Sequence, residues 1–469
     1  MIVIGSARGQ GILVSKLLLG ATLSLFAIAP IVAVLQQGVL WQHSSYGAPN
    51  SIALSNDGSF IAVGLQTGPA SGSIQLYDKA GSLLWTRTVD WAIGSISISA
   101  NGSYIVASGY QLIGRLGVYE NGGIFFYDRN GTQLWNYTAG YDQSGQFRLP
   151  IFQVQLSSDG STVVGATQSS ALLFDDHGTL LWSHNATLGQ FVRVSGSSNE
   201  SYVAVADYYP GSGYPPNEVF LFNRQGTKLW NSSAVTDGID GFAMSHDGRF
   251  VAVGSGPNGE NGTLYLYSNV GSLLWTRHVN SPPFSIAVSG DDSTIVIGTN
   301  WGAIGYDIQG NVIWTYNGAS AGSMAVSSDG SYVLAGLWAD WQQTILILNN
   351  QGHVVWGKDA GTIHQVALSA DDSYAAIAAG PSDTGTFSAN SATIYFLPGP
   401  RTTTANTGTS YSLLYFIPTL AIVPPASILP AIPVASVVII DRRKRSKSRL
   451  QKSEDPAKES PGPSIPSEP

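Results

Sequence analysis

The chain has 469 residues, of which 54 are glycine and only 11% are charged, and this composition suits many short strands joined by tight turns better than helices. It contains no cysteine, which excludes disulfides, thiolate metal ligands, a cysteine nucleophile and a lipid-modified cysteine. Residues 36–400 carry 11 Lys and Arg against 25 Asp and Glu, a balance of −14, so nucleic acid is not an expected partner.

The chain opens with an apolar stretch. Residues 17–35 carry no charge and follow Arg8 and Lys16, a pattern typical of a secretory signal or an N-terminal membrane anchor. A small-residue pair that could mark a cleavage site is followed directly by Pro30, so the pattern does not decide between the two. We therefore expect residues 1–36 to be a signal peptide or an N-terminal anchor.

Residues 37–400 repeat one pattern at the period of propeller blades, about 40–50 residues. Each unit has a short apolar strand, a turn built on Asp or Asn, two more strands with alternating apolar residues, and a fourth strand that carries Trp four residues after Gly. The Asp or Asn accepts backbone hydrogen bonds in the turn, and the glycine that usually follows allows positive φ. The turn residues are Asp57, Asn101, Asp159, Asn199, Asp247, Asp291, Asp329 and Asp371.

The number of strands indicates how the ring closes. The first three strands of the unit occur eight times, whereas the Trp strand occurs seven times in register and once more, without its partners, before the first unit. Pairing that early strand with the last unit leaves no open sheet edge. The sequence thus predicts an all-β, eight-bladed β-propeller closed by an N-terminal strand. Its blade tryptophans are Trp41, Trp85, Trp135, Trp182, Trp230, Trp275, Trp314 and Trp356.

Two segments resemble known repeats. "LYDKAGSLLWT" at 76–86 resembles the repeats of quinoprotein-dehydrogenase-like (PQQ-like) propellers, and "SSDGSYVLAG" at 327–336 resembles WD repeats. The resemblance covers residues 39–397 and implies that the repeated Trp packs between adjacent blades. It also raises a PQQ-dependent oxidoreductase as an alternative function. However, the chain lacks carboxylates at the spacing of a Ca²⁺ loop, so we expect no enzyme, no cofactor and no metal site.

Other catalytic patterns are weak. The seven histidines are scattered, and none forms a zinc-spaced pair. A Gly-x-Ser-x-Gly match at 318–322 follows a Trp strand and precedes another strand, whereas a nucleophile elbow needs a helix after it. We interpret this match as a loop between blades and expect no catalytic residue.

The long insertions fall on one face of the predicted ring, between second and third strands or between fourth and first strands. Variability confined to one face is how a repeat scaffold presents a binding surface. The inserted segments are Gln66–Gly72, Tyr110–Gly122, Thr138–Leu149, Asp207–Glu218, Gly254–Gly262, Leu337–Gln343 and Gly380–Ala392.

Aromatic residues in these insertions are the candidate ligand contacts, beside acidic residues such as Asp207 that we expect to be exposed. Two further candidates near first strands could line the central channel. The candidates are Tyr208, Tyr209, Tyr214, Trp338, Trp341, Tyr141, Trp91 and Arg193. The aromatic side chains could equally pack the loops onto the blades, and Arg193 could be a solvated channel residue. The leading hypothesis is a cell-surface module that binds a protein or a glycan. The second non-enzymatic hypothesis is a scaffold for envelope assembly.

Seven Asn-x-Ser/Thr sequons occur at predicted turns and strand ends, where they would be accessible to glycosylation. Asn-Gly-Ser is also a favourable turn in its own right. The sequons begin at Asn101, Asn130, Asn136, Asn185, Asn199, Asn231 and Asn261.

The C-terminal part predicts a membrane anchor. Residues 401–410 are a Thr-rich stalk, and residues 411–440 are apolar although they contain five prolines, so that a spanning helix would be kinked; a buried strand and loop is the other interpretation. Six Lys and Arg follow within 442–449, and such a basic cluster after an apolar span favours a cytoplasmic position. We therefore expect residues 441–469 to be a cytoplasmic tail that is basic at first and then disordered. We therefore expect a plasma-membrane protein with the propeller extracytoplasmic.

Overall fold

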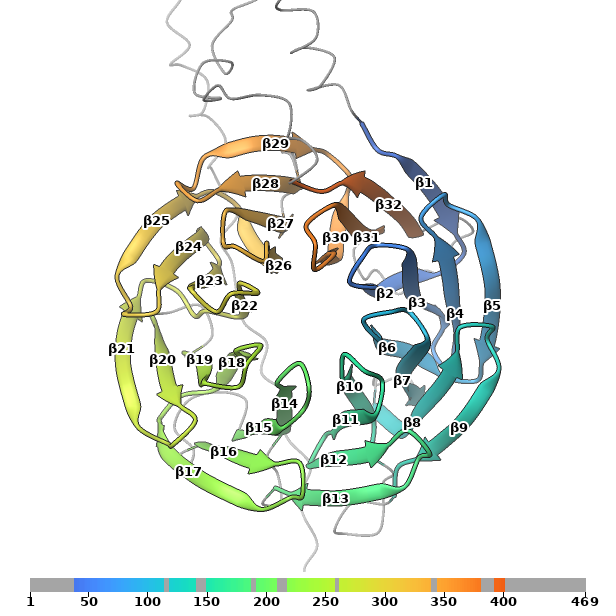
Figure 1. The fold of residues 1–469 in the computed structure, drawn as a ribbon, viewed down its shortest axis with the longest axis horizontal. Coiled ribbons are helices and arrows are strands. Elements are labelled where there is room, and N and C mark those ends of the chain that lie inside the picture. Colours follow the sequence, from blue (N-terminus) through green and yellow to red (C-terminus); the bar gives the residue numbers. More distant parts are fainter. Residues whose placement is uncertain are drawn as a thin grey trace, which may run out of the picture. The chain divides into compact units, whose positions relative to one another are not determined.

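The computed structural model describes residues 38–113, 118–140, 149–186, 191–208, 217–257, 261–338, 344–380 and 392–400. These residues form strands and turns (Figure 1). Within them, no helix is long and apolar enough to cross a bilayer. The predicted N-terminal segment, stalk, C-terminal span and tail lie outside the described residues.

Thirty-two strands, four in each sheet, make up the described chain. They are β1 (Trp41–Ser45), β2 (Ala48–Leu54), β3 (Phe60–Gly68), β4 (Ser71–Asp78), β5 (Leu83–Val89), β6 (Ala92–Ile98), β7 (Tyr104–Ile113), β8 (Val118–Asp128), β9 (Gln133–Thr138), β10 (Ile151–Leu156), β11 (Thr162–Thr167), β12 (Ser170–Asp175), β13 (Leu180–Asn185), β14 (Phe191–Gly196), β15 (Tyr202–Tyr208), β16 (Asn217–Asn223), β17 (Lys228–Val235), β18 (Ile239–Met244), β19 (Phe250–Ser255), β20 (Gly262–Ser268), β21 (Leu273–Val279), β22 (Ser285–Val288), β23 (Thr294–Thr299), β24 (Gly302–Asp307), β25 (Val312–Asn317), β26 (Ser320–Val326), β27 (Tyr332–Trp338), β28 (Ile345–Asn349), β29 (Val354–Lys358), β30 (Thr362–Leu368), β31 (Tyr374–Gly380) and β32 (Ala392–Pro398).

The eight sheets are arranged as a ring, which confirms the predicted propeller (Figure 1). Blades 1 to 7 are β2–β5, β6–β9, β10–β13, β14–β17, β18–β21, β22–β25 and β26–β29, each with its first strand innermost. Blade 8 has the order β30-β31-β32-β1. Trp41 of β1 lies opposite Phe396 of β32 in antiparallel register, and the Leu40 amide donates to the Phe396 carbonyl at 2.8 Å. The N-terminal strand therefore closes the ring as predicted.

The repeated Trp docks each blade onto the next, as the resemblance implies. The Trp85 indole packs on Gly131 in the third-to-fourth-strand turn of blade 2, and its Nε1–H donates to the Arg129 carbonyl at 2.8 Å. Gly131 has φ +77°, and a Cβ there would strike the indole. The same indole-to-carbonyl bond is formed by Trp41, Trp135, Trp182, Trp230 and Trp275. Trp314 packs on Gly352.

Trp356 is the exception. Blade 8 has no turn between its third and fourth strands, because β32 and β1 come from distant parts of the chain. Trp356 is half-buried and instead packs in the cluster that contains Val39 and Tyr395. Blade 8 is thus completed by the pairing of β1 with β32, and it offers no third-to-fourth-strand turn on which Trp356 could dock.

Two of the predicted long loops are extended hairpins. β3 and β4 pair as far as Gly68 and Ser71, and β7 and β8 pair as far as Ile113 and Val118. The prediction of loops at 66–72 and 110–122 was wrong because these segments continue their ladders beyond the blade body. Alternating residues with strand propensity extend a hairpin as readily as they fill a loop.

Candidate functional site

The two faces of the ring are built differently. Turns from first to second strands and from third to fourth strands lie on one face, here the short-turn face; the remaining connections form the long-loop face. The innermost strands of the blades surround the centre of the ring, which we call the channel; they are β2, β6, β10, β14, β18, β22, β26 and β30 (Figure 1).

On the short-turn face, every first-to-second-strand turn repeats one hydrogen-bond pattern. In blade 1, the Ser55 hydroxyl and the Ser59 amide donate to the Asp57 carboxylate, at 2.9 Å each, while the Phe60 amide donates to the Ser55 hydroxyl at 3.0 Å. The first serine of this pattern is buried in all eight turns, at Ser55, Ser99, Ser157, Ser197, Ser245, Ser289, Ser327 and Ser369. The repeated Asp and Asn therefore serve the fold by stabilising these turns.

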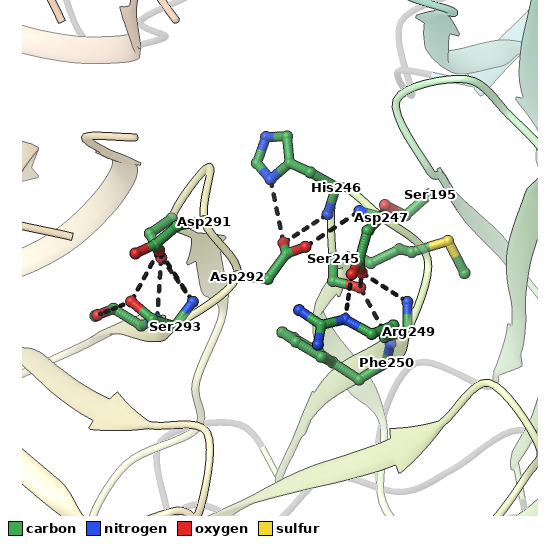
Figure 2. Close-up of polar contacts among 12 residues, drawn as sticks. Ser195, Ser245, His246, Asp247, Arg249, Phe250, Asp291, Asp292 and Ser293 are labelled. Atoms are coloured by element: carbon green, nitrogen blue, oxygen red, sulfur yellow. Dashed lines mark hydrogen bonds and ion pairs between the residues drawn. The ribbon is translucent and has the colours of Figure 1, made fainter. Parts of the chain in front are cut away.

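Hydrogen bonds also join each of these turns to the next around the channel mouth. Six links are backbone bonds, such as the Asn56 amide to the Ala100 carbonyl at 2.8 Å. The other two use carboxylates that replace the usual turn glycine. Asp292 accepts from the His246 and Asp247 amides at 2.8 and 3.2 Å, with the His246 Nδ1 at 3.5 Å (Figure 2). Asp372 accepts from the Ser328 amide at 2.9 Å.

Hydrogen bonds lower the pKa of several carboxyls of this ring. Burial alone would raise the pKa of Asp57, but the hydrogen bonds from Ser59 and Ser55 outweigh it and lower that pKa. The pKa of Asp292 is likewise lowered, because bonds from His246 and Asp247 outweigh burial. In their charged form these groups stabilise the turns. Their oxygens accept hydrogen bonds within the fold, and we therefore assign them a structural role.

Glu200 departs from this pattern. It also replaces the turn glycine, at φ +48°, but its fully buried carboxylate has no hydrogen-bond partner among the described residues. In blades 1, 2, 3 and 5 the turn glycine packs against an aromatic ring of the preceding blade, as Gly102 does against Phe60, and in blade 7 Gly330 packs against Thr294. Opposite Glu200 that residue is Thr162, which is smaller and leaves room for the longer side chain. Burial raises the pKa of Glu200 to about 8, with Thr162 and Arg224 acting in the opposite direction.

The channel wall is mostly neutral and internally bonded. The Gln155 side-chain amide donates to the Gly196 carbonyl at 2.9 Å and accepts from the Gly196 amide at 3.0 Å, joining blades 3 and 4. The inner strands carry one Arg, one Asp and one His: Arg193, Asp240 and His364. Sequence analysis did not single out Asp240 or His364 on this wall.

Arg193 and Tyr208 come together at the long-loop mouth of the channel. The Arg193 Cζ lies 5.4 Å from the Tyr208 ring centre, and the Arg193 Nε donates to the Ile239 carbonyl of blade 5 at 3.2 Å. Burial raises the pKa of Asp240, and the Arg193 guanidinium opposes that shift. These three side chains form a polar cluster across blades 4 and 5.

Trp338 forms a separate aromatic platform on the same face. Its ring is 55% exposed and lies parallel to Phe284 of blade 6, with an interplanar angle of 5° and ring centres 5.8 Å apart. Its Nε1–H donates to the Ile363 carbonyl of blade 8 at 3.2 Å, and a Cβ on Gly322 of blade 7 would strike the indole. Contacts from three blades thus hold an exposed indole in one orientation.

The other sequence candidates divide into three groups. Trp91 packs against Gly109 and Phe125 of the middle strands of blade 2, so its ring serves the blade core rather than the channel. Asp207 was wrongly expected to be exposed: it is buried, and its Oδ2 lies 2.8 Å from His184 Nε2 of blade 3. Tyr141, Tyr209, Tyr214 and Trp341 lie outside the described residues.

Tyr208 and Trp338 do not form one site. They end the second strands of blades 4 and 7, which lie on different sides of the channel (Figure 1). Phe284 and Gly322, which position Trp338, were missed from sequence. The signal for Gly322 was the second glycine of the Gly-x-Ser-x-Gly match, which lies in β26.

All seven sequon asparagines are exposed. Asn101 and Asn199 accept turn hydrogen bonds through Oδ1, the atom that N-glycosylation leaves in place. The sequons lie between residues 101 and 263, and therefore within blades 2 to 5.

One group of described residues has the spacing of a cation site: Asp175, Asp176 and His177, whose ligand atoms lie within 4.8 Å of one another. The group lies in an exposed turn, and the Asp175 carboxylate already accepts from the His177 and Thr179 amides at 3.0 and 2.7 Å. Its geometry is that of the third-to-fourth-strand turn of blades 1 to 7.

Comparisons with known proteins agree with the fold. Residues 217–362 match the family model described as outer membrane protein assembly factor BamB, which confirms the resemblance to PQQ-like repeats over blades 4 to 7. The Dos1 propeller aligns with a TM-score of 0.55 and 10% identity over 78% of this chain and 95% of that one. The C-terminal WD40 domain of Sif2 gives 0.56 and 11% over 77% and 98%. A search of curated proteins finds no match.

Proposed function

We propose that this chain is a membrane-anchored binding module whose extracytoplasmic propeller recognises a protein or a glycan through its long-loop face. The observation that carries the proposal is Trp338: an exposed indole fixed by Phe284, Gly322 and Ile363. Large, rigid aromatic surfaces gain contact area at low cost in conformational entropy, and tryptophan is enriched among the residues that dominate binding energy.

The contrast with the opposite face supports this assignment. The polar groups of the short-turn face are used in turns and links between blades, whereas Trp338 and Trp301, which is 68% exposed, present aromatic surface to solvent. Exposed large aromatics are characteristic of interaction sites.

Site-specific photo-crosslinking in intact cells tests the proposal. A benzophenone side chain at Trp301, in the β23–β24 turn on the long-loop face of blade 6, should capture a protein or glycan partner, and Trp338→Ala in the same chain should abolish capture. Val270→Ala is the matched control, because Val270 is 78% exposed in a turn of the opposite face and should leave capture unchanged. Capture that persists in Trp338→Ala would show that the platform is not the site.

An envelope assembly scaffold is the second candidate, favoured by the family match over residues 217–362. The matched family is described as an outer membrane protein assembly factor. If this chain has a comparable role, solubilised membranes should yield it in a stable complex with other membrane proteins. The crosslinked partner would then be a membrane protein rather than a glycan.

A further inference from the structure

The two ends of the propeller leave it at one point. β1 is an outer strand that begins on the short-turn face, and β32 is a third strand that ends there, so residues 38 and 400 lie on the same face of blade 8. The register confirms their proximity, since Trp41 pairs with Phe396.

The apolar segments 17–35 and 411–440 are therefore attached at the same place. Three residues separate position 35 from position 38 and span at most about 10 Å, and the eleven from 400 to 411 span at most about 40 Å. With both segments in a bilayer, blade 8 is the part of the ring nearest the membrane. The short-turn face then points toward the bilayer and the long-loop face away from it.

Apolar side chains lie on the same rim. Each outer strand of blades 1 to 7 has a register shift between its first residues and Trp, and the residues there are apolar in most blades. In blade 1 they are Leu83 and Leu84, which are 50% and 44% exposed. Leu40, directly before β1 of blade 8, is also 50% exposed.

The sequons lie on one arc of the ring: Asn101, Asn130 and Asn199 are in turns of the short-turn face, whereas Asn185 and Asn261 are at the long-loop face. Outer strands or turns of blades 2, 3 and 4 carry six sequons and blade 5 carries the seventh, whereas blades 6, 7, 8 and 1 carry none. A glycan cannot enter a bilayer interface, while exposed leucines gain free energy there. The arc without sequons is centred near blade 8, where the chain ends emerge.

We infer that the short-turn rim of blades 8 and 1, through Leu40, Leu83 and Leu84, lies against the lipid surface and that the Trp338 platform faces away from it. The inference rests on the proposed membrane anchoring. It gives the binding module a fixed orientation, with its long-loop face open to partners outside the cell.

The absence of cysteine allows a direct test with single-cysteine variants of the full chain. Each variant is labelled with an environment-sensitive fluorophore and reconstituted in phosphatidylcholine vesicles that contain spin-labelled lipid. Leu84→Cys should lose fluorescence to the spin-labelled lipid. Leu181→Cys is the matched control, since Leu181 has the same bulge position in blade 3 and 45% exposure; it should be quenched by aqueous iodide only, as should Trp301→Cys.

Lipid quenching at position 181 equal to that at 84, or lipid quenching at position 301, would overturn the orientation. Flotation of the vesicles after carbonate extraction separates this failure from failure of the anchoring itself. A chain that floats but shows only aqueous quenching at position 84 refutes the orientation alone. A chain that does not float refutes the membrane anchor and the orientation together.

Discussion

The short-turn face and the long-loop face of this propeller differ in how much they repeat. On the short-turn face, turns of one pattern bond to their neighbours around the channel, and indoles dock on the turns of the following blade. On the long-loop face, the Trp338 platform and the Arg193 cluster each occur once. Free energy of folding is thus concentrated in the repeated contacts, and the groups available for recognition lie where the repeat is interrupted.

Repetition makes the first face testable blade by blade, because equivalent positions have different neighbours. Trp85 docks on a turn and Trp356 has none to dock on. Glu200 and Asp292 both replace glycine, but only Asp292 bonds to the preceding blade. If stability comes from the contact with the next blade rather than from residue type, each pair should respond differently to the same substitution.

The largest effect is expected at the docked tryptophan. Trp85 is buried and bonded to the Arg129 carbonyl, so Trp85→Ala should lower the free energy of unfolding by about 4 kcal/mol, the usual cost of removing a buried indole. Trp356→Ala should cost clearly less, because its half-buried ring has no turn to fill. Urea denaturation of both variants measures the difference; equal costs would mean that docking on the turn adds nothing.

The repeated half of the molecule was predictable because its signals are local. The turn Asp or Asn, as at Asp57, and the strand Trp, as at Trp85, recur from blade to blade. The extra Trp strand at Trp41 was sufficient to predict how the ring closes. Period-two alternation and turn chemistry act over a few residues, so the sequence alone reveals them.

The candidate site was predictable only in part. Trp338 was identified as a loop aromatic, but its partners Phe284 and Ile363 come from other blades, and contacts across blades leave no spacing in the sequence. Asp207 was taken as exposed for the same reason, since His184 lies on the neighbouring blade. The sequence also did not reveal that the Glu200 carboxyl has no hydrogen-bond partner among the described residues, because Glu200 occupies the same turn position as Asp292, which has partners.

Glu200 should make stability depend on pH in the direction opposite to the turn aspartates. Its pKa of about 8 in the folded chain exceeds the value of 4.5 for an unperturbed glutamate, so the folded state holds a proton that the unfolded state releases. The contribution of Glu200 to the free energy of unfolding is therefore greatest below pH 4.5 and falls as pH rises toward 8. Between pH 5 and pH 8 the loss should be roughly 3 kcal/mol.

Glu200→Gln separates this titration from backbone strain. It keeps the residue at positive φ but cannot ionise, so its unfolding free energy should lose less between pH 5 and pH 8 than that of the unchanged chain. Glu200→Gly should also remove the strain and be more stable than the unchanged chain at pH 8. Parallel pH profiles for all three chains would contradict a buried neutral carboxyl.

The smallest effect is expected at Asp292. It also distinguishes most clearly between Asp292 and Glu200, which are both acidic residues that replace the turn glycine. Asp292→Gly restores the residue that most blades have and relieves φ +60°, yet it removes the acceptor of the His246 and Asp247 amides. Hydrogen bonds to a charged group contribute more than relief of strain at one residue returns, so we expect a net loss of about 1 kcal/mol by urea denaturation. Because the pKa of Asp292 is lowered in the fold, its contribution is present at neutral pH and is lost as pH falls through that lowered pKa. Glycine should therefore destabilise position 292 and stabilise position 200 at pH 8; the same sign at both would mean that strain, not the link to the preceding blade, governs these turns.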